Sequence, residues 1–67
     1  MGTVTINGVE RLLGDAKTLA ELFEALGVQS HKKAVEKNGE IIPSTSWAST
    51  SLQSGDTLEI IQFVGGG

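Results

Sequence analysis

The residue types that most often carry catalysis are scarce in this chain. It contains one histidine, His31, and neither cysteine nor tyrosine among its 67 residues. Without cysteine there can be no thiol nucleophile, no thiolate-ligated zinc and no disulfide framework. A single imidazole cannot make a metal site, and a general base needs a positioned substrate. Because His31 lies in the polar run QSHKK, we interpret it as a solvated loop residue and predict no metal site.

Two pairs of carboxylates are close enough in sequence to be considered as acid–base pairs. Glu21 and Glu24 are three residues apart, and Glu36 and Glu40 flank an Asn–Gly turn. Acid–base catalysis needs surroundings that separate two pKa values, and nothing in the neighbouring sequence predicts burial of either pair. We interpret both pairs as a solvated face. The chain is therefore not expected to be an enzyme or to have catalytic residues of its own.

The remaining chemical feature is the sequence FVGGG, which ends in Gly65, Gly66 and Gly67. A terminal carboxylate is ionised at neutral pH and can attack a phosphorus centre. Attack on the α-phosphate of ATP gives an acyl-adenylate, whose carbonyl is open to sulfur or nitrogen nucleophiles. The chain has no G-x-x-x-x-G-K-[ST] loop to bind phosphates itself. In this chemistry the protein is the substrate of a partner enzyme.

A glycine end is compatible with two interpretations. Chain ends are often disordered, and a glycine-rich end can be without function. Alternatively, glycine permits close backbone approach in a narrow channel because it has no Cβ, and residues 64–67 reach roughly 13 Å when extended. The tail follows a predicted strand rather than a loop, which would hold its base firmly and favours the second interpretation.

Length and charge narrow the class of protein. A chain of 67 residues is one domain, and domains of this size bury only about 60% of their unfolded surface, so a deep, enclosed active site is not expected. The net charge is −3, and the only adjacent basic pair is Lys32–Lys33, which argues against nucleic acid as a partner. No signal peptide and no apolar run of about 20 residues is found. We expect a soluble cytoplasmic domain without a membrane partner.

The first half of the chain has the pattern of a hairpin followed by a helix. Residues 3–6 alternate, and Asn7–Gly8 is the strongest short-range signal for a hairpin turn; Val4 and Ile6 should point inward, with Leu12 or Leu13 from the second strand. The helix is predicted from Thr18, which with Glu21 forms a capping box, to Gly27, which suits a left-handed C-terminal cap. Its apolar stripe is formed by Leu19, Leu22, Phe23 and Leu26.

The second half repeats the hairpin pattern and ends in a strand. Residues 34–37 and 40–42 flank Asn38–Gly39, and Pro43 should end the second of these strands or place it at an edge. The polar run STSWASTSLQSGD predicts an irregular or short helical crossover that Trp47 anchors in the core. Residues 54–56 are a predicted turn, and TLEIIQFV is the last strand.

The resulting ββαββ order predicts an α+β fold. The single helix must bury its apolar stripe against one face of a sheet of four or five strands, and a β-grasp (ubiquitin-like) arrangement of a mixed sheet satisfies this requirement, with the last strand in the middle beside the first. We place the β-grasp domain at residues 1–64 and a flexible C-terminal glycine tail at residues 65–67.

The last strand divides its residues between two faces of the sheet. Leu58, Ile60 and Gln62 share one face, and Glu59, Ile61 and Phe63 the other. Leu58 and Ile60 mark the core face, so Ile61 and Phe63 should lie on the open side, just before the tail. Either they fill a loop-covered part of the core, or they form a partner surface that directs the tail.

The whole chain resembles the ThiS family of ubiquitin-like sulfur carriers of thiamine biosynthesis. The segments VEKNGEIIPSTSW and GDTLEIIQFVGGG carry the resemblance. The final Gly66–Gly67 is shared by all ubiquitin-like carriers, whereas these longer segments are more specific. One departure is Ser44, where members of the family often have a basic residue after the proline.

The resemblance implies a function and a set of partners. An E1-like adenylyltransferase (ThiF) would activate the Gly67 carboxylate with ATP and magnesium, which that enzyme rather than this chain would bind. Sulfur from a cysteine desulfurase would then give a terminal thiocarboxylate, from which thiazole synthase (ThiG) would take the sulfur. Gly65 and Gly66 would be the tail that enters the partner, and Ile61, Phe63 and Val64 the partner face.

Three alternatives remain open at this stage. The small subunit of molybdopterin synthase is also a β-grasp carrier with a Gly–Gly end, although it is usually longer and tends to have prolines before the tail. A protein modifier would join Gly67 to lysines of target proteins. An interaction module with an inactive tail is the third, because fold alone does not determine function.

Overall fold

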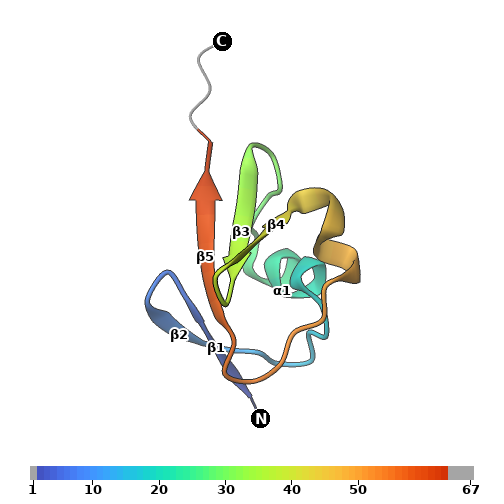
Figure 1. Ribbon diagram of the computed structural model, residues 1–67. Helices are drawn as coiled ribbons and strands as arrows, with labels where there is room; N and C mark the ends of the chain where they lie inside the picture. Colours follow the sequence, from blue (N-terminus) through green and yellow to red (C-terminus); the bar gives the residue numbers. More distant parts are fainter. Residues whose placement is uncertain (1, 64–67) are drawn as a thin grey trace.

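The computed structural model describes residues 2–63 and contains one mixed five-stranded sheet (Figure 1). The elements are β1 (Thr3–Ile6), β2 (Val9–Leu12), α1 (Leu19–Leu26), β3 (Lys33–Lys37), β4 (Glu40–Pro43), the 3₁₀ helix η1 (Ser44–Ser49) and β5 (Thr57–Gln62). The strand order is β2-β1-β5-β3-β4. β5 lies in the middle, parallel to β1 and antiparallel to β3. The β-grasp fold predicted from the sequence is confirmed.

Both hairpins turn at the predicted Asn–Gly pairs. Asn7 and Gly8 have φ of 50° and 82°, and Asn38 and Gly39 have φ of 52° and 90°. A two-residue turn with both central residues at positive φ matches the twist of the flanking strands. The register therefore pairs Ile6 with Val9 in one hairpin and Lys37 with Glu40 in the other.

Helix α1 begins and ends at the predicted capping residues. The Thr18 hydroxyl accepts a hydrogen bond from the Glu21 N–H at 3.2 Å, and a Glu21 carboxylate oxygen accepts one from the Lys17 N–H at 2.7 Å. Both capping side chains therefore satisfy backbone donors at the start of the helix. At the other end Gly27 is left-handed, with φ of 74°.

The core lies between α1, η1 and one face of the sheet. Nine buried residues form it: Val4, Ile6, Leu19, Leu22, Phe23, Val35, Trp47, Leu52 and Leu58. Trp47 anchors the crossover, as predicted. Its ring meets Phe23 edge-on with the ring centroids 4.8 Å apart, and its indole N–H donates to the Ile42 carbonyl at 3.2 Å. Because the buried indole has this partner, its polar atom costs little.

The positions of three leucines settle what the sequence left open or differ from what it predicted. Leu13 packs against the core, whereas Leu12 is 69% exposed on the edge strand β2. Leu26, the fourth residue of the predicted apolar stripe, is 41% exposed. It lies in the last turn of α1, where a pocket separates the helix from the β1–β2 hairpin, so the stripe is fully buried only over its first three residues.

Candidate functional site

The proposed reactive end, Val64 with Gly65, Gly66 and Gly67, lies outside the described residues, and the structure shows how the chain leads to it. β5 occupies the centre of the sheet and pairs with β3 along its whole length. The Phe63 N–H donates to the Lys32 carbonyl at 2.8 Å and extends this ladder by one residue beyond β5. The last described residue before the tail is thus tied to the sheet.

The two faces of β5 are divided as the alternation predicted. Leu58 is completely buried, and Ile60 packs against the core. Ile61 is half-buried, Phe63 is 54% exposed, and neither belongs to the core cluster. The structure therefore favours the open side of the sheet for both residues. Their role in binding a partner stays a prediction.

Three residues of β3 and β4 join Ile61 and Phe63 on this side of the sheet. Ala34 is directly opposite Ile61 on one side and Pro43 on the other. Ile41 lies two residues before Pro43, hence on the same face, and is 61% exposed. We call these five residues the open-face patch: Ala34, Ile41, Pro43, Ile61 and Phe63. Ala34 is buried although it lies outside the core cluster.

A shallow hollow of 350 Å³ lies over this patch. Its lining consists of Ser30, Lys32, Lys33, Ala34, Ile41, Pro43, Ser44 and Phe63. The lining joins apolar residues of the patch to Lys32 and Lys33, whereas Glu36 and Glu59 face each other across β3 and β5 further from the tail. The surface beside the tail is therefore apolar with a basic border, which suits a partner with apolar and acidic groups.

Ser44 also lines this hollow, and the sequence had marked it only as a departure from the family pattern. A basic side chain at this position would enlarge the basic border of the hollow, and Ser44 does not. Ile41 and Pro43 were not singled out as site residues from the sequence. Their alternation along β4 was visible, but only the strand order brings β4 to the same surface as Phe63.

The other candidates for chemistry do not assemble into a site. His31 is exposed in a turn, Glu21 and Glu24 are exposed on α1, and Glu40 is exposed at the second hairpin. Within residues 2–63 no three side chains of histidine, cysteine or carboxylate type are grouped so that they could hold a metal ion. In the same range no helix is long and apolar enough to cross a membrane.

Comparison with known structures finds the same fold in thiamine biosynthesis proteins. The crystal structure of a thiamine biosynthesis protein (ThiS) from Geobacter metallireducens superposes with a TM-score of 0.81 and 34% identity, over 97% of this chain and 99% of that one. A solution structure of a thiamine biosynthesis protein from the same organism gives a TM-score of 0.70, also with 34% identity, over 97% and 87% of the two chains.

Sequences similar to this chain occur as segments of longer proteins and also as nearly the whole of a short protein. A thiazole synthase of Paramagnetospirillum magneticum is 47% identical over 64 residues, which are 96% of this chain but 20% of that protein. A thiazole synthase of Magnetococcus marinus is 31% identical with the same coverage. The chain thus spans about a fifth of the length of these relatives. An uncharacterized protein of Pyropia yezoensis is 37% identical over 97% of this chain and 92% of its own length.

The family comparison covers both the folded domain and the glycine end. The model of the ThiS family matches residues 3–67, a range that includes every strand of the sheet, the open-face patch and the last three glycines. Fold, strand order and C-terminal sequence agree with this match. The chain belongs to the ThiS family.

Proposed function

We propose that this protein is a sulfur carrier for thiazole formation in thiamine biosynthesis, and that its Gly67 carboxylate is the group that carries the sulfur. The match of the family model through residue 67 is the observation that carries the proposal. The structural neighbours are named as thiamine biosynthesis proteins, which supports a role in that pathway. The scarcity of catalytic side chains in this sequence fits a protein that is acted upon by enzymes.

The proposed chemistry has two steps on the terminal carbonyl. First, a carboxylate oxygen of Gly67 attacks the α-phosphorus of ATP and pyrophosphate leaves, in the site of an E1-like adenylyltransferase that binds ATP and magnesium. Second, a sulfur nucleophile at the oxidation level of sulfide attacks the carbonyl carbon and AMP leaves. The product is a thiocarboxylate on Gly67. A cysteine desulfurase is the proposed source of the sulfur; because it releases the sulfur as a persulfide, a thiol reductant must supply two electrons to bring it to the level of sulfide.

The architecture of the described residues supports this role. The tail must extend from the domain into a partner, and β5 leads to it from the centre of the sheet, where the backbone is held by β3 as far as Phe63. The open-face patch lies directly beside that exit. We propose that Ile61, Phe63 and Val64, together with Ile41 and Pro43, contact the activating enzyme or the sulfur acceptor, and that Gly65 and Gly66 enter its channel.

The relatives support a thiazole synthase as the acceptor of the sulfur. Two proteins named thiazole synthase contain a segment similar to this chain over about a fifth of their length. Covalent linkage of two modules gives an effective concentration in the millimolar range when the linker spans the sites. Such linkage in the relatives fits two modules that act on each other, and we propose that the open-face patch of this chain contacts a thiazole synthase.

The proposal is tested by intact-mass measurement after incubation with the cognate adenylyltransferase, ATP, magnesium and sulfide. We expect one oxygen of the last residue to be replaced by sulfur, and no exchange when ATP is omitted. Deleting Gly67, or adding one residue after it, should abolish the exchange while the circular-dichroism spectrum stays unchanged. Exchange in the extended protein would refute the role of Gly67, and isopeptide-linked adducts in its place would indicate a protein modifier.

A further inference from the structure

The two edges of β5 are unequally covered. On one edge β5 pairs with β3 as far as Gln62. On the other edge it pairs with β1 only at Thr57 and Leu58, because the chain turns away at Asn7–Gly8. In Figure 1 β5 accordingly continues past the β1–β2 hairpin. Within residues 2–63, the second half of β5 therefore has a strand on one side only.

The hydrogen bonds to β3 identify the backbone groups that face this free edge. Because the Phe63 N–H donates toward β3, the alternate residues Ile60 and Gln62 direct their N–H and C=O groups the other way. One of these groups, the Ile60 N–H, is already hydrogen-bonded, because it donates to the Asn7 side-chain Oδ1 at 2.8 Å. Within residues 2–63, no strand pairs with the Ile60 carbonyl or with the N–H and C=O of Gln62.

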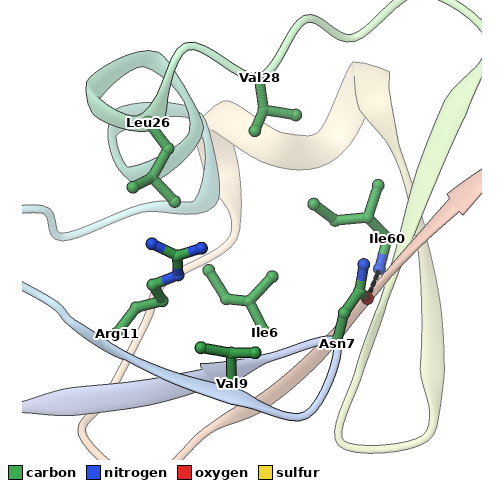
Figure 2. A pocket seen from close by; sticks show the side chains of 7 residues that line it. All are labelled: Ile6, Asn7, Val9, Arg11, Leu26, Val28 and Ile60. Atoms are coloured by element: carbon green, nitrogen blue, oxygen red, sulfur yellow. Dashed lines mark hydrogen bonds between the residues drawn. The ribbon is translucent and has the colours of Figure 1, made fainter.

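A pocket of 290 Å³ adjoins this edge on the helix side of the sheet (Figure 2). It is lined by Ile6, Asn7, Val9, Arg11, Leu26, Val28 and Ile60. Val9 and Leu26 are 53% and 41% exposed, so the pocket opens to solvent. An engineered apolar cavity of about 150 Å³ holds benzene, and this pocket therefore has room for one large apolar side chain.

Among the described residues of the lining, Arg11 alone is charged. Figure 2 shows its guanidinium directed into the pocket near Leu26 and Ile6, without a hydrogen bond to another lining residue. A guanidinium presents a planar set of donors that matches a carboxylate. Apolar walls with this cation at one end favour an occupant that is apolar and carries a carboxylate.

We propose that an extended segment of a partner protein pairs with the free edge of β5 and places an apolar side chain in this pocket. Strand addition at an exposed edge takes its affinity from main-chain hydrogen bonds and its specificity from pockets for alternate side chains. Residues two apart on a strand share a face, so an acidic residue two positions from the apolar one reaches Arg11. This contact needs neither ATP nor the Gly67 carboxylate and is distinct from the proposed sulfur chemistry.

The proposal is tested by NMR titration of the intact protein with a blocked threonine-rich peptide that contains a leucine and, two positions later, a glutamate. We expect the Gln62 amide to shift most and its exchange with solvent to slow. Arg11→Glu should weaken binding about tenfold, whereas Lys17→Glu, an equal charge change in an exposed loop, should not. A peptide with lysine in place of glutamate should prefer the Arg11→Glu protein.

The main-chain part of the contact has its own test. Proline is tolerated in a strand where its missing N–H faces outward, so Gln62→Pro removes the donor at the free edge, and Gln62→Ala serves as the matched control. Loss of peptide binding in the proline variant alone supports strand addition. The proposal would be overturned if the Gln62→Pro and Gln62→Ala proteins bound the peptide equally, or if the Gln62 amide did not shift at millimolar peptide. It would also be overturned if the free protein sedimented as a dimer through this edge.

Discussion

The asparagines of the two hairpin turns fasten the central strand as well as turning the chain. The Asn7 Oδ1 accepts a hydrogen bond from the Ile60 N–H, and the Asn38 Oδ1 accepts one from the Thr57 N–H, both at 2.8 Å. The Asn38 Nδ2 also donates to the Asp56 carboxylate at 3.0 Å. β5 is thereby held at its first residue and in its second half by side chains that come from outside its own segment.

Two substitutions at Asn38 separate its two contributions. Asn38→Gly keeps access to positive φ but removes the side-chain hydrogen bonds, and we expect a loss of about 1 kcal/mol in the free energy of unfolding. Asn38→Ala should lose about 1 kcal/mol more, because alanine is strained at a φ of 52°. Urea denaturation measures both. Equal stability of the two variants would show that the backbone conformation contributes nothing.

At Phe63 we expect function and stability to respond differently. Phe63→Asp places a charge in the open-face patch and should weaken binding to the activating or acceptor enzyme by about 2 kcal/mol, a hot-spot magnitude. Because Phe63 is 54% exposed and outside the core, the free energy of unfolding should change by about 0.5 kcal/mol or less. Calorimetric titration with the partner and urea denaturation give the two values.

Leu12→Asp is the matched control for this substitution. Leu12 is also an exposed apolar residue, 69% accessible, and pairs with Thr3 of β1 from the edge strand β2, at the opposite edge of the sheet from β4. It should leave partner binding unchanged. A similar loss of binding in both variants would mean that the partner does not distinguish the open-face patch, and a large loss of stability in Phe63→Asp would place its side chain in the core.

At the scale of the elements, α1 depends on its caps and on the segment that packs beside its start. The Leu19 N–H donates to the Thr50 carbonyl at 3.1 Å, and the Leu52 N–H donates to the Lys17 carbonyl at 2.9 Å. The beginning of the helix is therefore held both by its own cap and by the crossover that follows η1. A helix of eight residues is too short to be stable alone, so these contacts matter to its formation.

We expect Thr18→Ala to lower the free energy of unfolding by about 1 kcal/mol, because the Glu21 N–H loses its hydroxyl partner. Thr18→Ser should keep most of the free energy of unfolding of the original protein, since the serine hydroxyl supplies the same acceptor. Thr45→Ala, at an exposed position in η1, is the control and should be nearly neutral. If Thr18→Ala were as stable as the Thr45 variant, the cap would not contribute.

At the scale of the whole molecule, we expect the folded domain and the proposed reactive end to be separate parts of the chain. Among residues 2–63, every member of the core cluster lies between Val4 and Leu58. A domain of this size has a small free energy of unfolding. A contribution of the tail to stability would therefore be a measurable fraction of that free energy.

Removal of residues 64–67 should therefore change the free energy of unfolding by about 0.5 kcal/mol or less and abolish sulfur incorporation completely. Thermal unfolding checks the expected stability, and intact-mass measurement of the same preparation checks the loss of sulfur incorporation. Removal of residues 57–67 is the contrasting variant, because it deletes the central strand β5 and should prevent folding. A truncation at residue 63 that unfolds would show that the end of the chain contributes to the domain.

The sequence alone determined the local structure, and it predicted the kind of chemistry. Asn–Gly pairs, the Thr18 and Gly27 caps and the alternation along residues 57–63 act within a few residues of one another, so they predict turns, helix limits and faces without knowledge of the rest. The resemblance to a family also rests on the printed order of residues, through to Gly67. The tail itself lies outside the described residues, and its role stays a prediction.

Only the tertiary structure decided what surrounds the exit of the tail. Strand order and register depend on packing between segments far apart in the chain, and local signals do not contain that information. Packing placed β4 beside β3, which brought Ile41 and Pro43 to the surface of Phe63. It also stopped β1 after two pairs with β5, because the hairpin turns there, and so left one edge of the central strand free beside Arg11.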